Sequence, residues 1–228
     1  IVLDGVRGVE PQTETVWRQR TRFQLPALFF INKLDRPGAD FGRALMTVRQ
    51  RLSLEPVAVT APAPDGDGSV IHLIEKARLR FLGERGEQVQ ITPCDAATWE
   101  RLRPLRESLL LAAAEMDEAL AEQVLAEKEP EPEAVWKALR LATVAGRVCP
   151  AFAGSALHNQ GVQPVLDGVL RLLPSPVERP LSLAHRPDGG EEWVAMTADG
   201  PLAALAFKVQ LWEGRRHVFA RLYRGALK

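Results

Sequence analysis

The chain has 228 residues, with 29 Lys and Arg against 29 Asp and Glu, so its formal net charge is zero. Apolar residues make up 46% of the chain and charged residues 25%, which indicates a globular protein and excludes a disordered or collagen-like one. No stretch approaches the roughly 18 consecutive apolar residues that a membrane span needs, so we expect no membrane insertion. The two cysteines, Cys94 and Cys149, have no disulfide or metal-ligand spacing, which favours a reducing, cytoplasmic location.

The first part of the chain alternates strand-like and helical patterns. Residues 1–3 are strand-like, and Pro11 suits the first turn of a helix that runs to about residue 23. The apolar run at residues 27–31 is typical of a strand buried on both faces of a parallel sheet. Helical spacing follows at residues 40–52, and residues 56–59 form another strand. This order predicts an α/β fold.

A different pattern begins near Pro62. A turn cluster there precedes an alternating, strand-like stretch at residues 70–81, and helical spacing covers about residues 99–125 and 133–145. The α/β pattern then resumes with a buried strand at residues 148–153 and a helix at residues 162–173. We therefore expect an α+β subdomain inserted into the α/β domain.

The last part of the chain predicts a second domain. Pro174, Pro176 and Pro180 form a stiff linker, because proline fixes φ and does not donate to a helix. Two strand-like runs, 202–210 and 217–223, are joined through a Gly-containing turn and predict a hairpin. The expected divisions are residues 1–61 and 148–176 for the α/β domain, 62–147 for the insert, and 177–228 for the linker and the first strands of a further domain.

The segment that follows the apolar run carries a recognisable chemistry. Asn32-Lys33-Leu34-Asp35 has the form N-K-x-D, and its side chains match a guanine base. A carboxylate accepts from the ring imine and the exocyclic amine, an Asn amide addresses the Hoogsteen edge, and a Lys stem can lie along the base. A later strand leads into Ser155-Ala156-Leu157, whose backbone N–H groups could bind the guanine carbonyl oxygen. The alternative is a capped turn in which Asn32 and Asp35 satisfy backbone groups.

Longer blocks extend this interpretation. They are Gly8-Val9-Glu10-Pro11-Gln12-Thr13-Glu14-Thr15-Val16-Trp17-Arg18-Gln19, the N-K-x-D run with Pro37-Gly38-Ala39-Asp40-Phe41, Gly154-Ser155-Ala156-Leu157, and the blocks at residues 161–167 and 201–208. In order and spacing they closely resemble the elongation factor G family of translational GTPases. The resemblance spans nearly the whole chain.

The resemblance implies a fold and a function. The fold would be an incomplete P-loop-type GTPase (G domain) sheet with an inserted α+β subdomain and the beginning of a β-barrel domain II. The parent protein would bind GTP or GDP, with Mg²⁺, and hydrolyse GTP on the ribosome to drive translocation in protein synthesis. The residues implied to read the base are Asn32, Lys33, Asp35, Ser155, Ala156 and Leu157.

The phosphate-handling parts of such a GTPase are not found in this sequence. None of the 17 glycines is followed by Lys, so the G-x-x-x-x-G-K-[ST] loop that holds the phosphates is absent. The chain also begins at Ile1, without an initiator Met or a signal peptide, and we expect it to be a piece of a longer protein. We assign no catalytic residue and no metal ligand, and we expect no catalysis and little base binding by the piece alone. His158 and Gln160 stand where the family usually has lysines.

Charge within the insert suggests a partner. Between residues 115 and 133 eight acids stand against Lys128 alone, a local charge of −7. In the family this subdomain contacts the ribosomal stalk protein, so we expect a contact face that includes Glu115, Glu118 and Glu122. A solvated helix surface is the alternative. Two other interpretations of the whole chain stay open, namely a non-catalytic ribosome- or protein-binding module and a divergent paralogue of the factor.

Overall fold

The structure is a computed structural model that describes residues 1–179, 181–186 and 188–227. It divides into two compact units, residues 1–173 and residues 174–228, and each is described by itself. Pro180, which we expected in the linker, lies outside the described residues.

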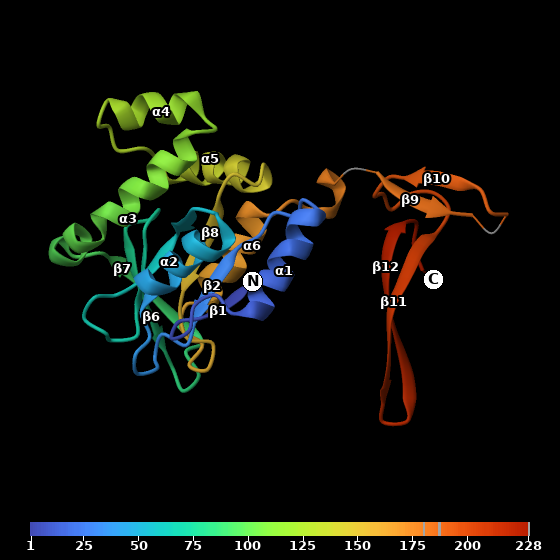
Figure 1. Cartoon of the computed structure of the whole chain (residues 1–228), viewed down its shortest axis with the longest axis horizontal. Helices are drawn as coiled ribbons and strands as arrows, with labels where there is room; N and C mark the ends of the chain where they lie inside the picture. Colours follow the sequence, from blue (N-terminus) through green and yellow to red (C-terminus); the bar gives the residue numbers. More distant parts are fainter. Residues whose placement is uncertain (180, 187, 228) are drawn as a thin grey trace. The chain divides into compact units, whose positions relative to one another are not determined.

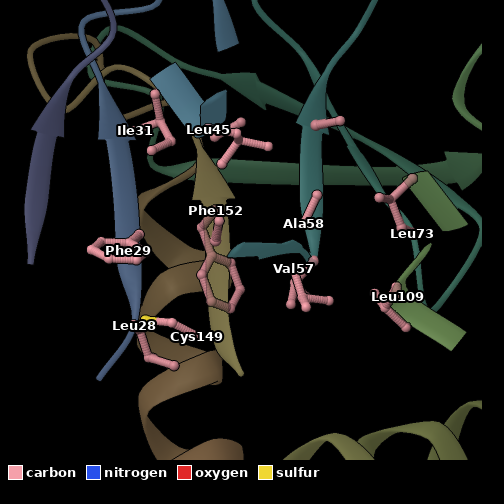
Figure 2. Packing of buried hydrophobic residues seen from close by; sticks show 14 of the residues in the cluster. Leu28, Phe29, Ile31, Leu45, Val57, Ala58, Leu73, Leu109, Cys149 and Phe152 are labelled. Carbon is pink, nitrogen blue, oxygen red and sulfur yellow. The ribbon is translucent and has the colours of Figure 1, made fainter. Parts of the chain in front are cut away.

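A four-stranded parallel sheet forms the centre of the first unit. Its strands lie in the order β1, β2, β8, β3, with bounds Val2–Asp4, Phe29–Asn32, Cys149–Ala153 and Pro56–Ala58. Figure 2 shows Phe29 and Ile31 of β2 beside Phe152 of β8, and all three side chains are fully buried. Burial of such continuous apolar runs on both faces is what the sequence predicted for parallel strands. The helices connected to this sheet are α1 (Pro11–Arg22), α2 (Phe41–Leu52) and α6 (Val162–Leu172).

A second sheet and three helices lie in the sequence between β3 and β8. The sheet is antiparallel, in the order β4, β5, β6, β7, with bounds Thr60–Pro62, Val70–His72, Ala77–Leu82 and Gln88–Pro93. The helices α3, α4 and α5 (Ala96–Ala114, Glu118–Leu125 and Pro132–Val144) lie together at one end of this unit (Figure 1). Parallel and antiparallel sheets together confirm the mixed α/β fold.

Val59 joins the two sheets. Its N–H donates to the carbonyl of Ala151 on β8 at 2.8 Å, and its own carbonyl accepts from Leu73 N–H at 2.8 Å. The neighbouring Thr60 hydroxyl oxygen accepts from Ala153 N–H at 2.9 Å. The second sheet is therefore hydrogen-bonded to β8 close to the point where β8 ends.

Two predicted elements are each broken in two. The stretch at residues 70–81 is interrupted by a turn in which Lys76 has a φ of 52°, a conformation that a strand cannot continue through. The helix predicted at residues 99–125 breaks at residues 115–117, because the Asp117 side chain accepts from Leu120 N–H at 3.1 Å and starts a new helix. The first of the two helices also starts earlier than predicted, at Ala96, after Asp95 as its cap.

In its described residues, the second unit contains a short 3-10 helix, Pro176–Glu178, and two strand pairs. Strands β9 (Ser182–His185) and β10 (Glu191–Val194) are antiparallel, and so are β11 (Ala203–Trp212) and β12 (Arg215–Arg224). The predicted hairpin is present, and its strands extend to the Glu213-Gly214 turn. Strands β4, β7, β9 and β10 were not predicted. In the described part of the chain, no helix has the length and apolar character needed to cross a membrane.

Candidate functional site

The predicted site residues gather at the carboxyl edge of the parallel sheet. Strands β2 and β8 pair in parallel with Ile31 opposite Ala153, so Asn32 and the loop after β8 leave the sheet side by side. Two backbone bonds join the exits, because Gly154 N–H donates to the carbonyl of Ile31 at 3.1 Å and Leu34 N–H donates to the carbonyl of Gly154 at 3.2 Å. Ligands of open α/β sheets bind at this edge.

Asn32 connects the two predicted segments directly. Its side-chain oxygen accepts from Lys33 N–H at 2.8 Å and from Ala156 N–H at 2.8 Å, although Asn32 and Ala156 lie 124 residues apart in sequence. Because the oxygen is engaged within the protein, the amide nitrogen of Asn32 is the group that remains to donate to a ligand.

The loop after β8 is closed by its own backbone. Ser155 and Gln160 exchange two N–H to carbonyl bonds of 2.9 Å each, and Asn159 N–H donates to the carbonyl of Ala156 at 3.2 Å. Ser155 N–H is therefore engaged, and Ala156 N–H would have to share its hydrogen between Asn32 and a ligand. Among the described residues Leu157 N–H has no hydrogen-bond acceptor, and the Leu157 side chain is 80% exposed.

Lys33 is held by a residue that the sequence analysis did not identify. Its ammonium donates to Asp4 Oδ2 at 2.7 Å, and its backbone has a φ of 64°, in the left-handed region. Asp4 ends β1, the strand next to β2, and its other oxygen accepts from the N–H groups of Val6 and Arg7. The Lys33 hydrogen bond is the main cause that lowers the pKa of Asp4. The available signal was the position of Asp4 at the end of a neighbouring parallel strand.

Asp35 is a carboxylate at neutral pH. The approach of the Ser155 hydroxyl is the main cause that lowers the pKa of Asp35, opposed by desolvation and helped by its own backbone N–H and the charges of His158 and Arg36. His158 Nε2 lies 3.6 Å from Asp35 Oδ2. The Ser155 hydroxyl is buried and has no partner of full hydrogen-bond geometry within the described residues. Asp35 can therefore act as an acceptor for two neighbouring donors of a ligand.

Two cavities adjoin these residues. One has a volume of about 360 Å³ and lies between the loops of the parallel sheet and residues 62–70 of the insert, with Asp35, Ser155, His158 and Gln160 in its wall. The other, of about 730 Å³, lies between residues 156–160 and the β6–β7 turn. In the described residues no group of three or more His, Cys, Asp or Glu side chains is arranged to hold a metal ion.

Comparisons with known proteins show which family the chain resembles. The family model of the elongation factor Tu GTP binding domain matches residues 1–175. Elongation factor G of Fervidobacterium nodosum is 38% identical over 231 residues, which cover 100% of this chain and 33% of that protein. Elongation factor G 2 of Geobacter metallireducens is 39% identical over 232 residues, which cover 100% of this chain and 34% of that protein.

A comparison with solved structures supports the fold. A crystal structure of a Thermus thermophilus protein superposes with a TM-score of 0.76 and 29% identity, covering 99% of this chain and 31% of that one. The chain thus spans about a third of the length of the relatives that it matches. On the match of residues 1–175 and on its similarity to elongation factor G along its whole length, the chain belongs to the family of the elongation factor Tu GTP binding domain.

Proposed function

We propose that the chain is the guanine-reading part of an elongation factor G-like GTPase that promotes ribosomal translocation in protein synthesis in the cytoplasm. The observation that carries the proposal is the bond network of Asn32, which holds the N-K-x-D segment and the Ser155–Leu157 loop against each other. The similarity of the whole chain to elongation factor G supports it.

The roles of the residues follow from their hydrogen-bonding capacity. Asp35 accepts from the ring imine and the exocyclic amine of guanine, and the Asn32 amide nitrogen donates to its Hoogsteen edge. The backbone N–H groups of Ala156 and Leu157 face the carbonyl oxygen of the base. Lys33, oriented by Asp4, lies along the base with its aliphatic stem. The nearby Ser155 hydroxyl is the main cause that lowers the pKa of Asp35 and so favours its charged form.

An NMR titration of the chain with GDP, and separately with ADP, tests this assignment. We expect GDP to shift the backbone amide signals of residues 32–35 and 155–157, and ADP to leave them unchanged. Asp35→Asn should weaken the binding of GDP more than the binding of inosine diphosphate, because inosine has no exocyclic amine for the carboxylate to bind. Equal responses to GDP and ADP would refute guanine reading by this site.

We further propose that the 228 residues alone do not hydrolyse GTP. Catalysis of phosphoryl transfer depends on positioning and charge stabilisation of the phosphates, and the sequence contains no G-x-x-x-x-G-K-[ST] loop to supply them. Calorimetric titration should give only weak GDP binding, and a nanomolar affinity would contradict this account.

The insert is proposed as the contact site for the ribosomal stalk protein. Glu115, Glu118 and Glu122 are exposed and form no ion pair with the described residues. Other acids of the same segment are already neutralised, since Glu129 pairs with Lys76 and Arg106, and Glu133 pairs with Arg171 at 2.8 Å. Among the described residues, the acids of this segment without an ion pair are Glu115, Asp117, Glu118, Glu122, Glu127 and Glu131, and the first four of these lie on or just before α4.

Charge reversal tests this contact. Glu118→Lys with Glu122→Lys should weaken binding of purified stalk protein to the chain, because exposed complementary charges steer association. The matched control, Asp199→Lys with Glu213→Lys, makes the same change of net charge at exposed residues of the second unit. Equal binding by both double variants would refute the contact. A ribosome- or protein-binding module without nucleotide binding remains the alternative, and it predicts stalk binding together with no response to GDP.

A further inference from the structure

The insert reaches the base-contacting loop, residues 155–160, through the turn between β6 and β7. The carbonyl of Gly86 in this turn accepts from Asn159 Nδ2 at 3.2 Å and from Gln163 Nε2 at 3.2 Å. Asn159 belongs to the loop itself, and Gln163 lies in the first turn of α6, directly after it. One carbonyl of the insert thus anchors both the loop and the helix that follows.

Gly86 has no room for a side chain. It is buried and has a φ of 63°, and a Cβ at this position would stand 2.7 Å from the carbonyl oxygen of His158. Any other residue would therefore have to push the turn away from the base-contacting loop.

A second turn of the insert touches the same loop from another side. At Gly68 a Cβ would stand 2.5 Å from Gln160 Nε2, so the Gln160 side chain lies directly against the turn backbone. The turn is fixed by Arg78 of β6, a nearly buried side chain whose guanidinium donates to Asp65 at 2.7 Å and to Asp67 at 3.2 Å. Asp67 also accepts from Ser69 N–H at 2.9 Å.

These contacts are transmitted to the base-reading groups through backbone bonds. Gln160 exchanges two hydrogen bonds with Ser155, and Asn159 N–H binds the carbonyl of Ala156. Ala156 N–H in turn donates to Asn32. A shift of either turn of the insert therefore changes the position of the amides that would face the base.

We propose that the two turns of the insert hold the base-contacting loop in the shape that binds guanine, with Asn159, Gln160 and Gln163 as positioning residues. The inference rests on the proposed function of the site and extends it to residues that touch no part of the base. It makes the insert, which supplies no base-reading group itself, a determinant of nucleotide affinity.

The test uses two double variants. The positioning variant carries Asn159→Ala and Gln163→Ala, and the control variant carries Gln88→Ala and Gln90→Ala. The control removes two amides of the same chemical type from exposed positions on β7. In NMR titrations of the whole chain, we expect the positioning variant to bind GDP and inosine diphosphate about tenfold more weakly, and by the same factor. The loss of affinity should be the same for both nucleotides, because guanine and hypoxanthine both have the carbonyl oxygen that the loop amides face. The control should bind as the unchanged chain does.

Amide hydrogen exchange gives a readout that does not depend on nucleotide. Loss of the anchor should accelerate exchange of Ala156 N–H about tenfold, while amides of β2 and β8 keep their protection. Gly86→Ala should act in the same direction. If the chain distinguishes GDP from ADP but the double variant matches its control, the inference is wrong and the proposed function stands. If GDP and ADP act alike, the proposed function is wrong, and unchanged exchange of Ala156 would overturn the inference as well.

Discussion

Replacing His72 with Gln should alter how the stability of the first unit depends on pH. His72 ends β5, is 8% exposed and lies against Trp136, with ring centroids 5.4 Å apart. Its Nδ1 accepts from Glu75 N–H at 3.3 Å. Burial, followed by the charges of Arg171 on α6 and Arg106 on α3, lowers the pKa of His72 to about 4. The fold therefore favours the neutral imidazole.

The sign and size of the effect follow from this pKa. The unfolded chain takes up the proton near the ordinary value of 6.5, whereas the folded chain takes it up only near a pH of about 4. The contribution of neutral His72 to the free energy of unfolding is thus fully present above about pH 6.5, and it is lost as the pH drops towards about 4. The difference in pKa corresponds to about 3 kcal/mol in full, of which about 2 kcal/mol is lost by about pH 5.

Chemical denaturation followed by far-ultraviolet circular dichroism measures this loss, because α1 to α6 all lie within residues 1–173. Gln at position 72 does not titrate, and its carbonyl oxygen can accept from Glu75 N–H. Between about pH 7 and about pH 5, the free energy of unfolding of the unchanged chain should fall by about 2 kcal/mol more than that of His72→Gln. His185→Gln removes an exposed imidazole and serves as the control. Parallel pH profiles of the unchanged chain and His72→Gln would refute the reasoning, and an NMR titration of the His72 ring measures its pKa directly.

Two further outcomes are expected from local packing. Gly161→Ala should destabilise the first unit by about 3 kcal/mol in denaturant titrations, since its φ is 76° and a Cβ would stand 2.1 Å from the carbonyl oxygen of Ala153. Full stability of the variant would contradict this. Burial raises the pKa of the Cys149 thiol to about 12, so a thiol reagent should modify Cys94, which is half-buried, before Cys149 under native conditions. Equal labelling rates, measured by mass spectrometry, would count against the buried position of Cys149.

Elements with a strong local pattern were predicted within a few residues. The apolar runs that became β2 and β8 have few alternatives to a buried strand. The helix α2, which begins at Phe41, has its cap in the sequence, since the Asp40 side chain accepts from Arg43 N–H at 2.8 Å. Strand β7 was missed because all of its residues are exposed or half-buried, with no buried apolar side chain to mark it. It exists because it pairs with β6.

The sequence by itself predicted which residues would read guanine, because N-K-x-D and the Ser155–Leu157 segment each follow a recognisable apolar strand. It also determined that the acids of the insert are concentrated in one segment. The tertiary structure decided which of those acids are exposed without a partner, and it added Asp4 as the partner of Lys33.

Only the tertiary structure connected the insert to the site. The bonds from Asn159 and Gln163 to Gly86 join residues 73 and 77 positions apart, and the bond from Ala156 to Asn32 spans 124 positions. A local pattern carries no information about such pairs. They form because the register of β2 with β8, and the attachment of the second sheet at Val59, bring the strand ends and the turns of the insert to the same edge.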